Sequence, residues 1–278
     1  MNTFCTSRHS HAARLALATG MMLAVFTGMA HAQPARNPEA TYAGLFSGSA
    51  WTDNRIEDVE GFANWGVPGW SLDYHDSGLV FGVLAGRKLE FAGIPLRLEV
   101  DGALGDMTAR SNRVDPEGLD ETVEVEFRWV ASARVGVEHA MGPVLLFATA
   151  GMALSRVNRS VTDIDSGRDT APHVDPDDSF SDHTTEVGWV AGAGLETHLA
   201  RAWDVRLEGL YMDFGRSTHY VNHSGNNRCG PGGLQKPCPY KIDNAHGVIR
   251  LAITYRFGHP RKQLKGIFQV RSHPVQAA

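Results

Sequence analysis

Acidic and basic side chains recur at every second position along several stretches of this sequence. Such spacing places side chains together on one face of a β-strand. Buried charges need partners of opposite sign, because an unpaired buried charge costs several kcal/mol. The pattern therefore predicts an internal ion-pair network or, alternatively, the lining of a small gated conduit. The residues expected to take part are Arg97, Glu99, Asp101, Glu124, Glu126, Arg128, Arg134, Glu138, Glu196, Arg206, Glu208, Arg250 and Arg256.

A second candidate for chemistry is the adjacent pair His223-Ser224. A serine nucleophile beside a histidine base is the minimum that acyl-ester hydrolysis requires. Adjacent residues on a strand point to opposite faces, however, and this pair lies in a stretch rich in Gly, Asn and Pro. We therefore expect no catalytic residues and no enzymatic activity, and keep a hydrolase as the less favoured alternative.

Two further groups have the composition of metal or redox sites. Asp163, Asp165 and Asp169 lie around Gly167, but this glycine is out of register for an EF-hand loop. We expect a solvated acidic loop, with weak divalent-cation binding as the alternative, and no resident metal or cofactor. Cys229 and Cys238 lie close together in a chain that is expected to be exported, which predicts a local disulfide.

The elements that must position these residues are β-strands. In 247–257, Ile249, Leu251, Ile253, Tyr255 and Phe257 alternate with polar, small or charged residues, which is typical of a half-buried strand. The same period of two recurs along the chain. The eight expected strands cover about 41–51, 78–90, 94–105, 122–139, 144–157, 186–199, 203–214 and 247–257.

The connections between these strands alternate in length. The long polar connections are 52–77, 106–121, 158–185 and 215–246, and the tight ones are 91–93, 140–143 and 200–202. A membrane barrel built of hairpins has this rhythm, with long loops outside the cell and short periplasmic turns. The sequence predicts an all-β fold: an eight-stranded antiparallel up-and-down transmembrane β-barrel. Side chains fill the interior of a barrel of this size, so no wide pore is expected.

The start of the chain has the features of an export signal. Arg8 and Arg14 precede an apolar run, and residues 30–32 form an A-x-A cleavage site. Loss of these two arginines leaves 24 basic against 31 acidic residues, a net charge of −7, which argues against nucleic-acid binding. The expected organisation is a signal peptide at 1–32, an outer-membrane barrel at 33–258 and a basic periplasmic tail at 259–278.

Period two shows that the two faces of a strand differ, but not which face is inside. A soluble calyx would line its interior with the apolar face. We favour lipid outside because the last strand ends in aromatic residues, the long connections lie at one end, and glycines are interleaved with the charges. Leu98, Val125, Leu207 and Ile253 are then expected to face hydrocarbon.

Three segments resemble the small opacity-type, OmpA-like outer-membrane barrels. Residues 203–215 are similar to the penultimate strand of that family, 247–258 to its last strand and 78–87 to its second strand. The family usually ends at the terminal aromatic residue, whereas this chain continues past Phe257. The resemblance implies the outer membrane of a Gram-negative bacterium, contact with lipid and lipopolysaccharide, and insertion by the barrel-assembly machinery.

The function expected from this architecture is structural and surface-interactive, meaning adhesion or recognition through the loops. The connection 52–77 is rich in aromatic residues, and Trp65, Trp70 and Tyr74 are its candidates for contact with a host or envelope partner. The alternatives are a small gated porin, a lipid A-modifying outer-membrane hydrolase and a soluble ligand-binding calyx.

Overall fold

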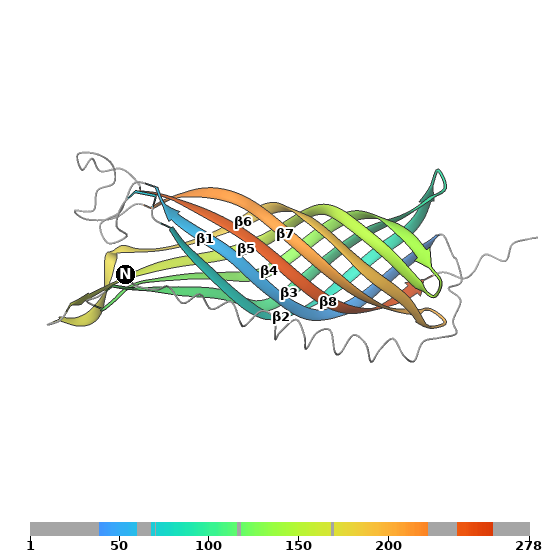
Figure 1. The fold of residues 1–278 in the computed structure, drawn as a ribbon, viewed down its shortest axis with the longest axis horizontal. Coiled ribbons are helices and arrows are strands. Elements are labelled where there is room, and N and C mark those ends of the chain that lie inside the picture. The colour runs from blue at the N-terminus through green and yellow to red at the C-terminus, as the bar shows by residue number, and fades with distance from the viewer. Residues whose placement is uncertain are drawn as a thin grey trace, which may run out of the picture.

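The computed structural model describes residues 39–59, 68–69, 71–115, 118–167, 170–221 and 238–257. The expected signal peptide and basic tail lie outside these residues and stay predictions. Every strand pairs antiparallel with its chain neighbours, and β8 closes the ring on β1, with Leu45 opposite Ile253 (Figure 1). The predicted eight-stranded barrel is confirmed. Its strands are β1 Ala40–Asp58, β2 Ser71–Phe91, β3 Ile94–Asp115, β4 Gly118–Met141, β5 Val144–Gly167, β6 Thr170–Ala200, β7 Trp203–Val221 and β8 Cys238–Phe257.

Three tight turns join β2 to β3, β4 to β5 and β6 to β7 at one end of the barrel, here called the turn end. They lie at the positions predicted from the sequence. Gly93 has a φ of 78° and Gly142 a φ of 59°, a conformation that glycine adopts without steric cost. These glycines therefore allow the chain to reverse within two residues.

The opposite end, here called the hairpin end, differs from the expected loops. Strands β3 and β4 continue to residues 115 and 118, and β5 and β6 to residues 167 and 170, so most of the predicted connections 106–121 and 158–185 are strand. These segments lack regular apolar alternation, because lipid imposes that pattern only on the part of a strand that crosses the membrane. Without that pattern, these segments carry no sequence signal for a strand.

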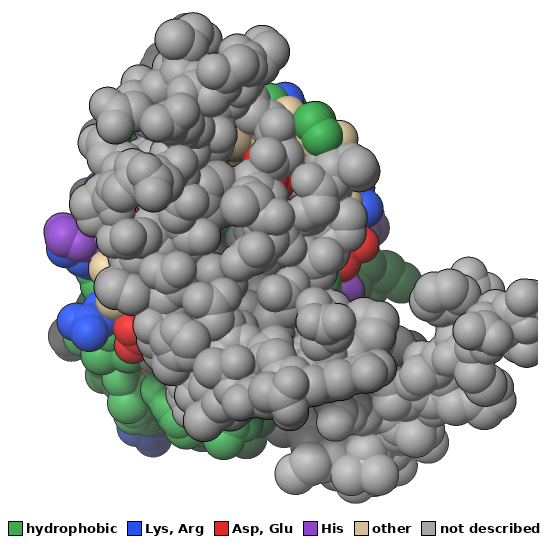
Figure 2. Space-filling view, turned by 90° about the vertical axis from the view of Figure 1, so that its left-hand side faces the viewer, with side chains coloured by type: hydrophobic (Ala, Val, Ile, Leu, Met, Phe, Trp, Pro, Cys, Tyr) green, Lys and Arg blue, Asp and Glu red, His purple; other side chains and the backbone are tan. Residues whose placement is uncertain are grey.

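An apolar belt surrounds the outside of the barrel. Leu98 is 45% exposed and Ile253 47% exposed, and Leu207 also lies on the outward face, as predicted. Aromatic pairs lie near both edges of the belt: Trp203 with Tyr255 at 5.0 Å near the turn end, and Trp189 with Tyr211 at 5.5 Å toward the hairpin end. Figure 2, which views the barrel from the hairpin end, shows apolar side chains on the outer flank and charged side chains around the rim. This pattern is typical of a strand barrel in a bilayer.

The prediction for Val125 is wrong, because the side chain is 1% exposed and faces inward. In β4 an extra residue, Arg128, lies between Phe127, which pairs with Val157, and Trp129, which pairs with Arg156. Such a β-bulge shifts the alternation of faces by one residue. On the turn-end side of the bulge the inward positions of β4 are even-numbered, as with Arg134. On the hairpin-end side they are odd-numbered, as with Val125.

Within the residues that the structure describes, no helix is long and apolar enough to cross a membrane.

Candidate functional site

The barrel interior near the turn end is organised around the carboxylate of Glu99. Tyr42 Oη donates a hydrogen bond to it at 2.7 Å, and Arg206 Nη2 donates another at 3.1 Å. Arg134 and Arg206 Nη1 form further ion pairs with the same carboxylate. Its charge is therefore compensated by side chains from strands across the barrel, not only from its neighbours on the sheet.

Two more carboxylates tie the same arginines together. Glu208 accepts from Arg134 Nη1 at 2.6 Å, from Arg206 Nη2 at 3.0 Å and from Arg250 Nε at 2.8 Å. Asp101 accepts from Arg250 Nη2 at 3.0 Å and from Arg134 Nη2 at 2.5 Å. Each of these arginines therefore bridges at least two carboxylates.

The branch nearest the turn end is built on Arg97. Its Nε donates to Glu138 at 2.6 Å, its Nη2 donates to Glu196 at 2.6 Å, and Lys88 pairs with both of these acids. Together these side chains form what we call the ionic cluster, in which the positive and negative charges are equal in number. Its members are Lys88, Arg97, Arg134, Arg206 and Arg250 with Glu99, Asp101, Glu138, Glu196 and Glu208.

Aromatic rings fill the space between the arginines. The guanidinium of Arg97 lies 4.1 Å from the ring centroid of Phe147, and that of Arg206 lies 4.8 Å from the same ring. Arg250 lies 4.2 Å from the ring of Phe46. The negative face of an aromatic ring attracts a cation, so these rings stabilise charges that water cannot reach. Gly82 makes room, because a Cβ there would lie 2.2 Å from Phe46 Cζ.

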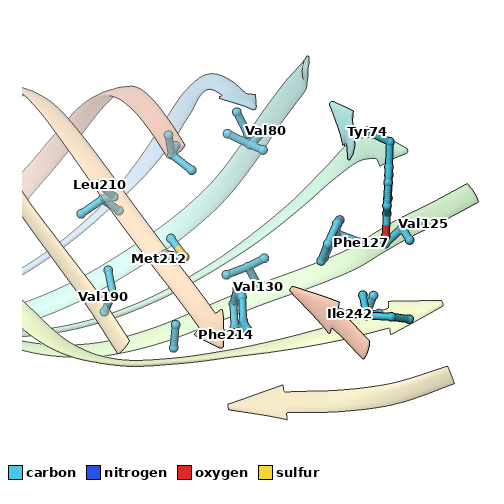
Figure 3. Close-up of a cluster of buried hydrophobic side chains, with 14 of the residues drawn as sticks. Tyr74, Val80, Val125, Phe127, Val130, Val190, Leu210, Met212, Phe214 and Ile242 are labelled. Atoms are coloured by element: carbon cyan, nitrogen blue, oxygen red, sulfur yellow. The ribbon is translucent and has the colours of Figure 1, made fainter. Parts of the chain in front are cut away.

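Most of the buried side chains in the hairpin-end half of the interior are apolar, and Figure 3 shows them. At its centre, the ring of His246 packs edge-on against Phe127 at 3.9 Å and Phe214 at 5.3 Å. We call this set the apolar cluster: Ala50, Ile56, Tyr74, Val80, Val125, Phe127, Val130, Ala153, Val157, Val190, Leu210, Met212, Phe214, Tyr240, Ile242 and Val248.

A cavity of about 20 Å³ lies where the two clusters meet, lined by Asp101, Val130 and Met212 among others. A space of that size holds about one water molecule. The interior is thus closed twice in series, first by ion pairs and then by apolar packing. This arrangement favours a filled scaffold over a conduit.

Most of the predicted interior charges meet in the ionic cluster: Arg97, Glu99, Asp101, Arg134, Glu138, Glu196, Arg206, Glu208 and Arg250. Arg256 lies apart at the turn end, where its Nε pairs with Asp204 at 2.8 Å. The sequence reasoning missed Lys88, although Leu89 beside it belongs to an alternating stretch that would have placed it on the inward face.

Glu124, Glu126 and Arg128 were predicted for the interior network, and this is wrong. Their side chains are 32%, 43% and 60% exposed and lie on the outside of the barrel, where Glu124 pairs with Arg110. The cause is the bulge at Arg128 that turns Val125 inward. No sequence signature marks the bulge, so the alternation read from the sequence assigns the residues on its hairpin-end side to the wrong face.

Tyr74 was predicted as a loop contact, but it is 2% exposed and belongs to β2 and the apolar cluster. The other contact candidates, Trp65 and Trp70, lie outside the described residues. So do Cys229 and the pair His223-Ser224; the disulfide therefore stays a prediction, and Cys238 is described only as the first residue of β8.

Asp163 and Asp165 lie in strand β5 and not in a loop, whereas Asp169 is outside the described residues. Among the residues that the structure describes, no group of three or more His, Cys, Asp or Glu side chains is placed to hold a metal ion.

A second polar group, which sequence reasoning missed, lies at the hairpin end. Arg159 Nη2 pairs with Glu186 Oε1, and Asn244 Nδ2 donates to Glu186 Oε2 at 2.9 Å. These residues come from β5, β6 and β8, and all three are buried. The only sequence signal for these residues is that the two-residue alternation of strand faces continues beyond the apolar belt, which would place them on the inward face.

Comparison with known proteins agrees with this architecture. The family described as outer membrane protein beta-barrel domain matches residues 20–257. The 31 kDa outer-membrane immunogenic protein of Brucella melitensis is 29% identical over 148 residues, which cover 52% of this chain and 58% of that relative. The match thus spans less than two thirds of that relative's length.

The 22 kDa outer membrane protein of Rhizobium leguminosarum bv. viciae is 27% identical over 189 residues, which cover 68% of this chain and 71% of that protein. Among solved structures, the outer membrane protein OprG of Pseudomonas aeruginosa has a TM-score of 0.44 and 13% identity, covering 79% of this chain and 97% of that one. Neither the family description nor these names states an enzymatic activity. The chain belongs to the outer membrane protein beta-barrel domain family and is a protein of the Gram-negative outer membrane.

Proposed function

We propose that this protein is a closed scaffold that supports the envelope and presents its hairpin end to the extracellular medium for recognition. The observation that carries this proposal is the doubly closed interior. A conduit through the ionic cluster would have to separate arginines from carboxylates that are both nearly inaccessible to water. Removing one partner of such a pair costs about 3–5 kcal/mol, so spontaneous opening is rare.

The strands that continue past the apolar belt support the second half of the proposal. Cross-strand ion pairs decorate this region, including Arg55 with Asp73 at 2.7 Å and Arg216 with Asp243 at 2.7 Å. Exposed pairs of this kind stabilise little, so their value is in the charge pattern that they present. Recognition usually lies in variable segments held by a rigid frame, and long hairpins on a filled barrel provide that frame.

Conductance and binding test the two halves separately. Purified full-length protein in planar bilayers should show no steady porin-scale current.

Replacing residues 59–70 by a two-residue Asn-Gly turn should leave insertion intact and abolish adhesion of expressing cells to immobilised extracellular-matrix proteins. Trp65→Ala and Trp70→Ala test the contact residues, and Tyr74→Phe is the interior control. A current that survives the hairpin replacement but changes in Arg250→Gln would contradict the proposal.

A further inference from the structure

The hairpin end contains a side-chain arrangement that neither a scaffold nor a contact surface requires. Backbone pairing between β6 and β7 ends, among the described residues, at Trp189 opposite Asp213, although both strands continue outward. Just beyond, Gly215 has a φ of 70° and donates its N–H to Asp213 Oδ1 at 2.7 Å. The register of β7 on β8 shifts at the same point. Such an irregularity redirects the side chains that follow it.

Two of the redirected side chains are Ser217 and His219, which lie two residues apart on β7 and therefore share one face. Ser217 Oγ lies 2.8 Å from His219 Nε2. On the other side of the ring, His219 Nδ1 lies 3.0 Å from Asp182 Oδ2 of β6. The order serine, Nε2, Nδ1, carboxylate is the one by which a carboxylate orients a histidine and the histidine activates a serine.

The histidine is in the protonation state that a general base needs. It lies beyond the apolar belt, with its side chain 16% exposed. Burial, and then the nearby Arg159, lower the pKa of His219 below its ordinary value, against the opposing effects of Asp182 and Glu186. The imidazole is therefore neutral at pH 7 and can accept the serine proton.

Arg159 lies next to this group of side chains and carries hydrogen-bond donors that no described residue uses. Arg159 is only 3% exposed, and its Nη2 pairs with Glu186 Oε1. The same glutamate oxygen lies 3.5 Å from Ser217 Oγ. The Nε and Nη1 atoms of Arg159 are buried and have no hydrogen-bond partner among the residues that the structure describes. Arg159 and Ser217 are thus linked through Glu186 Oε1, and donors without a partner are the kind of group that stabilises the oxyanion of an acyl-transfer intermediate.

We propose that Ser217, His219 and Asp182 form a hydrolytic site for carboxylic esters at the hairpin end. Ser217 Oγ attacks the acyl carbon while His219 Nε2 takes the serine proton. The alcohol leaves with that proton, and the acyl group stays on Ser217. Water then attacks the acyl-enzyme, His219 takes and returns its proton, and the carboxylic acid is released. Asp182 is a positioning residue that holds the ring.

The surroundings of the serine set the class of ester. Ser217 and His219 face the inside of the strand ring, so lipid on the outer flank does not reach them through the wall. Ser217 Oγ lies 3.4 Å from the carbonyl oxygen of Ile242, whose side chain belongs to the apolar cluster. The site therefore fits a water-soluble ester with a short acyl group, entering from the hairpin end and not from the bilayer.

The test uses full-length protein extracted from outer membranes, with p-nitrophenyl butyrate as substrate and a fluorophosphonate as serine-directed label. The expected result is ester turnover with label on Ser217, and loss of both in Ser217→Ala. His219→Gln should lower kcat/KM by about 10²- to 10⁴-fold. The matched control is Ser181→Ala, an exposed serine beside Asp182 that should change neither. The folded band on an unheated gel must persist in every variant.

A purely structural role predicts a different set of results. If the contacts of Ser217, His219 and Asp182 only tie β6 to β7, wild type and Ser217→Ala hydrolyse the ester equally, and the label maps elsewhere or nowhere; either outcome overturns the proposal.

Asp182→Asn gives an independent readout. It removes a group that raises the pKa of His219, so kcat should fall and the acid limb of the kcat/KM profile should move to lower pH. An acid limb unchanged in Asp182→Asn also overturns it. Failure of this site leaves the recognition proposal untouched, because adhesion does not require Ser217.

Discussion

In the turn-end half of the interior every arginine contacts a carboxylate, whereas in the hairpin-end half the side chains around His246 are apolar. Both halves exclude water, yet they depend on their neighbours differently. The ionic cluster joins strands that are not adjacent, as when Arg206 of β7 reaches Glu99 of β3. The apolar cluster fills volume without demanding a particular partner. The ionic cluster therefore specifies which strands face each other, and the apolar cluster mainly seals the interior.

Removing the central carboxylate should have the largest effect. Glu99→Leu leaves Arg134 and Arg206 with an uncompensated positive charge in a dry interior and leaves Tyr42 Oη without its acceptor. We expect a loss of about 3–5 kcal/mol in the free energy of unfolding, measured by urea titration in phospholipid vesicles.

A second substitution tests whether the cause is charge imbalance. Glu99→Leu combined with Arg206→Leu restores neutrality and should recover part of the loss. If the double variant loses more unfolding free energy than the two single variants lose together, charge compensation within the ionic cluster is not what stabilises this half.

In the apolar half, cavity formation replaces charge imbalance as the cause of destabilisation. Phe127 is fully buried, so Phe127→Ala should cost about 3–4 kcal/mol in the same titration. Leu104, which is 67% exposed on the lipid side, is the matched control, and Leu104→Ala should cost clearly less. Equal costs would mean that Phe127 does not face the interior and that the bulge is misplaced.

The turn-end half was largely predictable from the sequence, and the hairpin-end half was not. Between the short turns and the middle of the membrane, lipid imposes strict alternation, so Arg134 and Glu208 could be assigned to the same face from spacing alone. Strand order and closure followed from the alternation of long and short connections. The partners of each arginine could not follow, because they depend on the shear of the closed ring.

Near the bulge, local irregularities decided the outcome. One extra residue at Arg128 reversed the faces of Val125 and Phe127, and no composition signal marks it. Beyond the belt, the segment around Ser217 and His219 carries no apolar alternation. Asp182 meets His219 where the described backbone pairing of β6 with β7 has ended, and this arrangement depends on both strands together. A single sequence encodes such contacts only through three-dimensional packing.

A smaller effect, of opposite sign, is expected at His246. Both ring nitrogens are buried, and within the described part of the chain neither has a hydrogen-bond partner; the ring's neighbours are apolar. An unsatisfied buried polar group costs about 1–3 kcal/mol, and the aromatic contacts of the ring return about 0.5–1.5 kcal/mol. His246→Leu should therefore stabilise the barrel by about 1 kcal/mol. Destabilisation would indicate that the imidazole has a hydrogen-bond partner such as an internal water.

The smallest effect is expected just outside the bulge. Glu126 lies on the outer surface, 43% exposed, where it accepts a hydrogen bond from Asn158 at 2.9 Å and lies 3.5 Å from Arg128. Solvent screens such contacts, so Glu126→Gln should change the free energy of unfolding by less than about 0.5 kcal/mol. Glu99→Gln makes the same chemical change inside the ionic cluster and should cost several times more. Because the two glutamates were indistinguishable by spacing, equal costs would return Glu126 to the interior and remove the distinction between the two halves.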